Sequence, residues 1–303
     1  MAPAGHHIYT PTGLRLAYDT FGNETDAAIL LIAGLGTQRI RWTAAFCEAL
    51  AAKGFHVIRF DHRDTGSSTH FTHHPAPDLQ ALVTMLMAGQ RPQLPYTLHD
   101  MAEDALALLD ALQIDRAHVV GRSMGGMIAQ ILASDHAGRV LSLASVMSST
   151  GNPALPAASP GTMALMMRPA PNPVDDEAGF IAHSVAFARH IAGSADPFDE
   201  ETHRALVTEE LRRGHSPGGF ARHLAAMVVA GDRRARLATI KVPALVIHGV
   251  DDPLIPPACG EDTAASIPGA ALVIIERMGH DLPPAAYVRV VDAVERNARR
   301  AVA

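Results

Sequence analysis

The chain has 303 residues, of which 48% are hydrophobic and 18% are charged, a composition typical of a globular protein with a sizeable core. A formal net charge of −6 and the absence of any Lys/Arg run exclude a nucleic-acid-binding surface. Cys47 and Cys259 are the only cysteines and stand far apart, so no disulfide framework is expected.

The N-terminal sequence has neither the charged start nor the long apolar run of a signal peptide. No stretch reaches the roughly 20 apolar residues of a membrane span. These features predict a cytoplasmic protein with no membrane partner. Among the histidines, His6-His7 and His70, His73 and His74 stand in polar, loop-like sequence without Cys or carboxylate partners at ligand spacings. We therefore expect no metal and no other cofactor.

Short apolar runs alternate with helical patterns through the first half of the chain, which favours strand-helix units around a mostly parallel sheet. The expected strands there are residues 27–32, 57–60, 117–120 and 140–147. The expected helices are residues 43–53 and 98–112. Thr97, with Asp100 three residues later, predicts a capped start for the second helix.

Residues 121–125 read Gly-Arg-Ser-Met-Gly, between an expected strand and a helical pattern that includes residues 127–132. A tight turn at this junction would force Ser123 into a strained conformation with its hydroxyl exposed. The flanking glycines would allow the strand and the helix to approach closely. This arrangement is typical of a nucleophile elbow, although a Gly-x-Ser-x-Gly sequence without such a context also occurs by chance.

The pattern changes after Ser148, where a series of prolines precedes three expected helices with no strand between them. These helices are residues 175–192, 199–213 and 217–230. The strand pattern returns at residues 244–247 and 271–275, and a closing helix is expected over residues 284–299. We therefore predict a core domain of residues 1–148 and 232–303, with residues 149–231 inserted as a helical cap.

Methionines are frequent in the predicted cap, at Met163, Met166, Met167 and Met227, and Met85 and Met87 lie in another helical or loop segment. Two interpretations stay open for them. They either fill the packing between cap and core or form an adaptable apolar wall for a bulky substrate.

A serine nucleophile needs a base and a group that orients the base. Asp251 and Asp252 follow the expected strand at 244–247, and His280 follows the next strand. Both loops would open at the same edge of a parallel sheet, where ligands bind in open α/β folds. Asp281, as the neighbour of His280, is expected to point elsewhere.

Residues 61–68, Asp-His-Arg-Asp-Thr-Gly-Ser-Ser, and residues 240–244, Ile-Lys-Val-Pro-Ala, make the chain resemble the α/β-hydrolase family over nearly its whole length. The first of these segments is similar to the aclacinomycin methylesterase branch. The resemblance implies the α/β-hydrolase fold, a mostly parallel central sheet flanked by helices with an inserted helical cap. The family places the acid three residues after a glycine, which from Gly249 implies Asp252, and its Gly-His context implies His280 as the base.

Two backbone N–H groups would stabilise the oxyanion that forms when serine attacks a carbonyl. Met124, at the start of the helix after the elbow, provides the first in such elbows. The resemblance implies Leu35 as the second, by comparison with the family's His-Gly-x motif. This chain departs from that motif with Ala33-Gly34-Leu35-Gly36, but a backbone donor does not require the histidine.

These residues predict a serine hydrolase that cleaves carboxylic esters through an acyl-enzyme, with Ser123 as nucleophile, His280 as base and Asp252 as its orienting acid. The expected partner is a small-molecule ester, apolar and bulky, and the resemblance raises a methyl ester of a polycyclic metabolite. A peptidase of the proline iminopeptidase kind, a lactonase, a thioesterase, a carbon-carbon hydrolase and a perhydrolase share this triad. A slowly turning-over ligand receptor is the alternative of a different class. The substrate and the choice between monomer and homodimer stay open.

Overall fold

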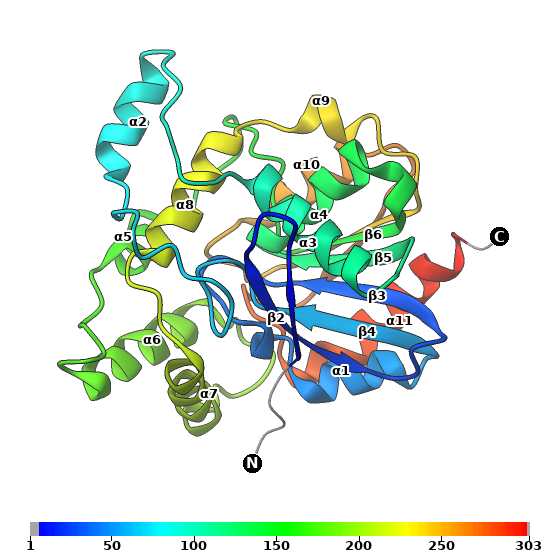
Figure 1. Ribbon diagram of the computed structural model, residues 1–303, viewed down its shortest axis with the longest axis horizontal. Coiled ribbons are helices and arrows are strands. Elements are labelled where there is room, and N and C mark those ends of the chain that lie inside the picture. The colour runs from blue at the N-terminus through cyan, green and yellow to red at the C-terminus, as the bar shows by residue number, and fades with distance from the viewer. Residues whose placement is uncertain (1–5, 302–303) are drawn as a thin grey trace.

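An eight-stranded sheet forms the centre of the molecule (Figure 1). In the computed structural model, which describes residues 6–301, its strands lie in the order β1-β2-β4-β3-β5-β6-β7-β8. Strands β3 to β8 are parallel to one another. β2 pairs antiparallel with β4 on one side and with β1 on the other. The strands are β1 (His6–Tyr9), β2 (Arg15–Phe21), β3 (Ala27–Ile32), β4 (Phe55–Phe60), β5 (Ala117–Arg122), β6 (Val140–Val146), β7 (Ala244–Gly249) and β8 (Ala271–Ile275). The ends of the predicted core, residues 1–5 and 302–303, lie outside the described residues.

The predicted mostly parallel α/β sheet is confirmed, and the six expected strands are β3 to β8. β1 and β2 were not predicted, and the interpretation of His6 and His7 as loop residues is wrong, because both lie in β1. β1 is a short edge strand with mostly exposed side chains. Such a strand has no buried face, so its sequence does not need the alternation of apolar and polar residues that signals a strand.

Helices cover both faces of the sheet (Figure 1). α3 and α4 pack on one face and α1 and α11 on the other, as the side chains of successive residues in β3 show: Leu30 joins the first core and Ile29 the second. Thr97 and Asp100 form the predicted capping box at the start of α3. The bounds of these helices are α1 (Ala44–Ala51), α3 (Leu98–Ala111), α4 (Met124–Asp135) and α11 (Tyr287–Arg299).

The segment between β6 and β7 contains helices and no strand within the sheet. Its helices are α5 (Pro160–Met167), α6 (Glu177–Ile191), α7 (Glu200–Arg213), α8 (Gly219–Ala230) and the short α9 (Arg234–Leu237). α5, α6, α7 and α8 lie together beyond one end of the strands (Figure 1). α2 (Leu79–Met87), from the core half of the chain, packs against α8.

The sequence had suggested that the prolines of this segment interrupt the chain before the helices, but not all of them do so. Pro160 occupies the first turn of α5, and the Ser159 hydroxyl accepts a hydrogen bond from the Thr162 N–H, so the pair starts a helix. A second helix that was not predicted, α10 (Pro257–Ser266), also begins with proline. Within residues 6–301, none of the helices is both long enough and apolar enough to cross a bilayer.

Buried ion pairs hold α7 and α8 against the core. The guanidinium of Arg222 in α8 makes two hydrogen bonds of 2.7 Å with the carboxylate of Asp64, and both side chains are almost fully buried. Arg213 at the end of α7 lies 3.0 Å from Asp61. Both aspartates belong to the 61–68 segment after β4, so this segment joins the helices to the sheet.

Candidate active site

Ser123 lies at the junction of β5 and α4 in a strained conformation, with φ 54° and ψ −123°. A positive φ is uncommon for a residue with a side chain and costs free energy. The two glycines make the sharp turn sterically feasible. A Cβ on Gly121 would lie 2.1 Å from the Gly125 carbonyl oxygen, and one on Gly125 would lie 2.2 Å from the Ile32 carbonyl oxygen. The local geometry is that of a nucleophile elbow.

Asp252 and His280 meet Ser123 in one chain of hydrogen bonds. His280 Nδ1 donates to Asp252 Oδ2 at 2.7 Å, and the Ser123 hydroxyl donates to His280 Nε2 at 3.0 Å. Asp252 follows β7 and His280 follows β8, so adjacent parallel strands deliver acid and base to the same edge of the sheet. All three residues are at least nine-tenths buried. The structure thus brings the predicted nucleophile, base and acid together.

The environment of Asp252 keeps its carboxylate charged. Burial alone would raise the pKa of Asp252, but attraction to His280 and hydrogen bonds from His248 and His280 lower it well below the usual range. The Oδ1 atom accepts the backbone N–H groups of Leu254 at 2.9 Å and Ile255 at 2.8 Å. A charged, fixed carboxylate is what holds an imidazole in one tautomer and stabilises its protonated form.

The neighbouring carboxylates take other partners. Asp251 lies in the turn after β7 and accepts a hydrogen bond from the Ser194 hydroxyl at 2.7 Å. Asp281 lies 3.3 Å from Arg122, the residue before the serine, and 3.5 Å from His203 in α7. Burial alone would raise the pKa of Asp281, but the hydrogen bond from His203 and the charge of Arg122 lower it far below its ordinary value.

The two predicted oxyanion donors, Met124 and Leu35, both lie near Ser123. Met124 is the first residue of α4, where a backbone N–H has no carbonyl partner within the helix. Gly34 is so close to the serine that a Cβ on it would lie 3.4 Å from the Ser123 Cβ. Leu35, the next residue, lines the same cavity as Ser123 and His280. The positions of both residues suit the predicted role.

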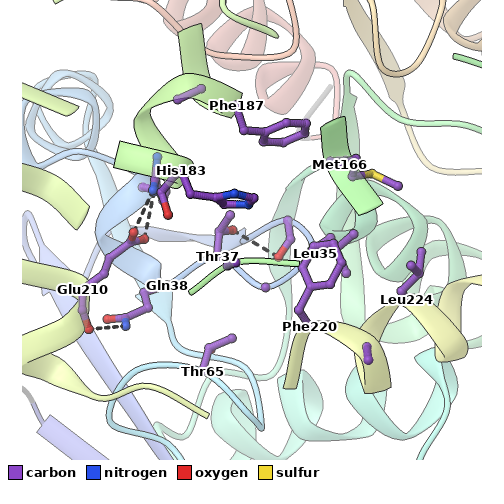
Figure 2. A pocket seen from close by; sticks show the side chains of 18 of the residues that line it. Leu35, Thr37, Gln38, Thr65, Met166, His183, Phe187, Glu210, Phe220 and Leu224 are labelled. Atoms are coloured by element: carbon purple, nitrogen blue, oxygen red, sulfur yellow. Dashed lines mark hydrogen bonds and ion pairs between the residues drawn. The ribbon is translucent and has the colours of Figure 1, made fainter. Parts of the chain in front are cut away.

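A cavity of about 810 Å³ opens above Ser123 and His280. Figure 2 shows Met166 of α5, Phe187 of α6 and Leu224 of α8 around it, with Leu35 from the loop after β3. The four methionines of the predicted cap line the cavity, whereas Met85 and Met87 do not. For the first four, this position favours the interpretation as an apolar wall. The volume lies in the range of small-molecule sites, about 300 to 1,000 Å³.

Two ion pairs line the cavity, Arg41 with Glu210 and Arg122 with Asp281, whereas Arg168 at the end of α5 has no ion pair among residues 6–301. Arg41 donates two hydrogen bonds to Glu210 of α7, at 2.8 and 2.7 Å. Gln38 donates to the Glu210 backbone carbonyl at 2.7 Å (Figure 2). Paired charges of this kind close one side of the cavity and tie α7 to the loop after β3. They leave the apolar side chains as the main surface available to a ligand.

Sequence reasoning missed His248, Arg122 and His203 as parts of the site. His248 lies at the end of β7, 3.4 Å from Asp252 Oδ2, and its Nε2 donates to the Ile255 carbonyl at 2.8 Å. A histidine inside an apolar strand four residues before the acid was an available signal. No comparable signal marks Arg122 or His203, because their partner Asp281 is distant in the sequence.

No group of three or more His, Cys, Asp or Glu side chains in the described part of the chain is arranged to hold a metal ion. His70, from the histidine-rich segment, donates to the Gly66 carbonyl at 2.9 Å. Cys47 and Cys259 are free thiols, and both are buried.

The chain belongs to the α/β hydrolase fold family, whose model matches residues 27–283. It is 34% identical to a rhodomycin D methylesterase of Streptomyces sp. strain C5, over 97% of this chain and 98% of that protein. A rhodomycin D methylesterase of Streptomyces peucetius is 33% identical over 92% of this chain and 93% of its own length. The predicted resemblance is confirmed.

Solved structures show the same fold. A hydrolase from Pseudomonas aeruginosa is 29% identical, with a TM-score of 0.65 over 100% of this chain and 99% of that one. The enol-lactonase from Burkholderia xenovorans is 25% identical, with a TM-score of 0.68 over 98% and 99%. The relatives thus include enzymes named for cleaving different kinds of ester bond.

Proposed function

We propose that this protein is a serine hydrolase of carboxylic esters. The observation that carries the proposal is the hydrogen-bonded chain from Ser123 through His280 to Asp252, which begins at a strained elbow and faces a cavity. The two similar proteins named as methylesterases support ester hydrolysis.

The geometry suits the following reaction. Ser123 Oγ attacks the ester carbonyl carbon while its proton passes to His280 Nε2, 3.0 Å away, and the N–H groups of Met124 and Leu35 hold the oxyanion. Collapse of this intermediate breaks the bond to the alcohol, which leaves with the proton from His280. Water then gives a proton to His280 and attacks the acyl-enzyme, releasing the acid and restoring Ser123.

The substrate that fits this site is a bulky ester with a largely apolar body. The cavity walls are mainly apolar, and two of the arginines that line it, Arg41 and Arg122, are ion-paired with Glu210 and Asp281. Four flexible methionines can adapt to an extended ring system. A methyl ester on a polycyclic compound combines these properties, and it is the kind of substrate that the names of the two methylesterases indicate.

The rival activities are less well supported. A proline iminopeptidase would need carboxylates to hold the substrate amine, but the candidate carboxylates of the cap are exposed helix starts away from the cavity: Asp175, Asp176, Glu177, Glu200 and Glu201. Epoxide hydrolysis or dehalogenation on this scaffold would need a carboxylate in place of Ser123. Lactonase, thioesterase, carbon-carbon hydrolase and perhydrolase activities use the same three residues, so a panel of substrates separates them. A slow ligand receptor differs by its lack of turnover.

We also propose that residues 149–231 act as a cap that sets the substrate, over a core of residues 1–148 and 232–303. The active form is a monomer or a homodimer. The protein acts in the cytoplasm, where a reducing environment keeps Cys47 and Cys259 as thiols.

The test measures turnover and labelling together. Wild-type protein is expected to release nitrophenol from acyl esters and to be labelled at Ser123 by a serine-reactive phosphonate. Ser123→Ala should abolish turnover and labelling without changing the fold. Ser134→Ala, near the end of the helix that follows Ser123, should change neither turnover nor labelling. If the wild-type protein shows neither turnover nor labelling, the proposed enzymatic function is wrong. A panel of methyl esters, lactones, thioesters and amides with small and polycyclic acyl groups then identifies the bond that is cleaved.

A further inference from the structure

The loop that carries Leu35 is bound at both ends by buried histidines from different parts of the chain. His62, after β4, donates from Nε2 to the Ala33 carbonyl at 3.1 Å. His223, in α8, accepts the Gly36 N–H at Nδ1 over 3.2 Å. The two rings lie 6.0 Å apart, edge to face, and both are almost completely buried. The histidines therefore bracket residues 33–36.

The partners of His223 fix its tautomer. Its Nε2 lies 2.8 Å from the Arg63 carbonyl oxygen, which can only accept a hydrogen bond, so Nε2 carries the proton. Nδ1 then has a free lone pair, as it must to accept the N–H of Gly36. Burial lowers the pKa of His223 to about 4, so the ring is neutral and keeps this acceptor at neutral pH.

The bond to Gly36 acts together with a second bond in the same loop. Thr37 donates both its hydroxyl and its N–H to the Gly34 carbonyl, at 3.1 and 3.3 Å, and the hydroxyl bond is drawn in Figure 2. In a trans peptide the C=O and N–H groups point in opposite directions. A fixed Gly34 carbonyl therefore fixes the direction of the Leu35 N–H, which belongs to the same peptide unit.

Gly36 is where this loop is free to rotate. Its φ of +63° is one that glycine adopts without strain, so the backbone here has little intrinsic preference. α8 restricts it twice. His223 binds the Gly36 N–H, and the Phe220 ring packs so closely that a Cβ on Gly36 would lie 3.0 Å from its Cδ2.

We propose that His223 is a positioning residue for ester cleavage: from the cap helix α8, it holds the loop of residues 33–36 so that the Leu35 N–H faces the oxyanion. This inference rests on the proposed esterase function. His223 does not line the cavity, so it acts through the loop and not on the substrate. The role couples cap and chemistry, because the helix that walls the cavity through Phe220 and Leu224 also orders the oxyanion donor.

Two substitutions separate this role from a purely structural one. In His223→Asn the amide oxygen takes the place of Nδ1 and can accept the Gly36 N–H, but the bond to Arg63 is lost. In His223→Gln the amide nitrogen takes the place of Nε2 and can donate to Arg63, but the bond to Gly36 is lost. The two variants have similar polarity and each leaves one of the two hydrogen bonds.

We expect His223→Gln to lower kcat by about 10- to 100-fold with little change in KM, because the oxyanion donor is misplaced while the substrate-binding walls stay. His223→Asn should keep kcat within a few-fold of the wild type. The readouts are kcat and KM on one nitrophenyl ester, with thermal unfolding of each variant as a measure of folding.

The outcome distinguishes this inference from the proposed function. An active wild type with the predicted order of the two variants supports it. An active wild type in which both variants lose kcat equally, or in which His223→Asn is the less active, overturns the positioning role and leaves the esterase function standing. A wild type without turnover overturns both.

Discussion

The guanidinium of Arg122 lies 3.3 Å from the carboxylate of Asp281, although 159 residues separate them in the sequence. Arg122 directly precedes the proposed nucleophile, and Asp281 directly follows the proposed base. His203 of α7 lies on the other oxygen of the same carboxylate, at 3.5 Å. The carboxylate of Asp281 therefore connects the turn at Ser123, the loop after β8 and helix α7.

The pair Arg122 and Asp281 should contribute to stability as a unit. In a double-mutant cycle of Arg122→Met, Asp281→Asn and the double variant, we expect a coupling free energy of about 1 to 2 kcal/mol from urea unfolding. The single variants should also lower kcat, because Asp281→Asn leaves Arg122 without its counter-charge and Arg122→Met leaves Asp281 with His203 as its remaining ion-pair partner. Strictly additive effects would show that the two charges do not interact in solution.

Asp252 and its neighbour Asp251 offer a matched test of the acid. Asp252→Asn removes the charge that stabilises the protonated His280 and is expected to lower kcat by about a thousand- to ten-thousand-fold. Asp251→Asn, in the same turn but bonded to Ser194, should leave kcat near that of the wild type. Steady-state kinetics on one ester measures both. Equal losses in the two variants would remove Asp252 from its proposed role.

The glycines of the elbow can be tested by adding one methyl group. Gly125→Ala would place Cβ 2.2 Å from the Ile32 carbonyl oxygen and 2.4 Å from that of Ala33, both backbone atoms. We expect it to lower the free energy of unfolding by about 3 kcal/mol or more and to abolish activity. Gly138→Ala is the control, since a Cβ there meets nothing within 4 Å. A stable, active Gly125→Ala variant would contradict the tight packing.

Three buried histidines predict a loss of stability in mild acid. Burial lowers the pKa of His118 and His223 to about 4 and that of His62 to about 3. In the unfolded chain an imidazole binds a proton near pH 6.5. Between about pH 6.5 and 4 the unfolded state thus binds more protons, so the free energy of unfolding falls as the pH falls.

His118 is suited to testing this pH dependence. It lies in β5, its Nδ1 is hydrogen-bonded to the Ser142 hydroxyl, and it does not line the cavity. His118→Asn should reduce the slope of unfolding free energy against pH by about 1.4 kcal/mol per pH unit within that window. His73→Asn, at an exposed histidine, is the control and should leave the slope unchanged. Urea unfolding at a series of pH values provides the slopes, and equal slopes for all three proteins would refute the interpretation.

The sequence predicted those features that local patterns determine. Strands β3 to β8 are apolar runs, the box at Thr97 depends on residues three apart, and the elbow at Ser123 combines local glycines with a strand and a helix. β1 escaped because its side chains are exposed, and α5 escaped because Pro160 was interpreted as a helix breaker although it occupies the first turn. In both elements the local sequence is compatible with a loop as well as with the strand or helix that forms.

Contacts between distant segments were not predictable from one sequence. Which residue of α7 reaches Asp281, and which residue of α8 binds Gly36, depends on how these two helices pack against the sheet. The approach of Ser123, Asp252 and His280 could be predicted from their order, because the carboxyl ends of parallel strands lie at the same edge of the sheet. No general property of the fold predicts the contacts of Arg122 and His223.

The order of the three proposed catalytic residues also has a consequence for synthesis of the protein. Ser123 follows β5, in the middle of the sheet, whereas Asp252 and His280 follow β7 and β8, which are made later. In a growing chain on the ribosome, Ser123 is therefore made well before His280, its proposed base. We expect hydrolytic activity to arise only after β8 and the following loop have been made, so a chain that stops before His280 should not cleave esters.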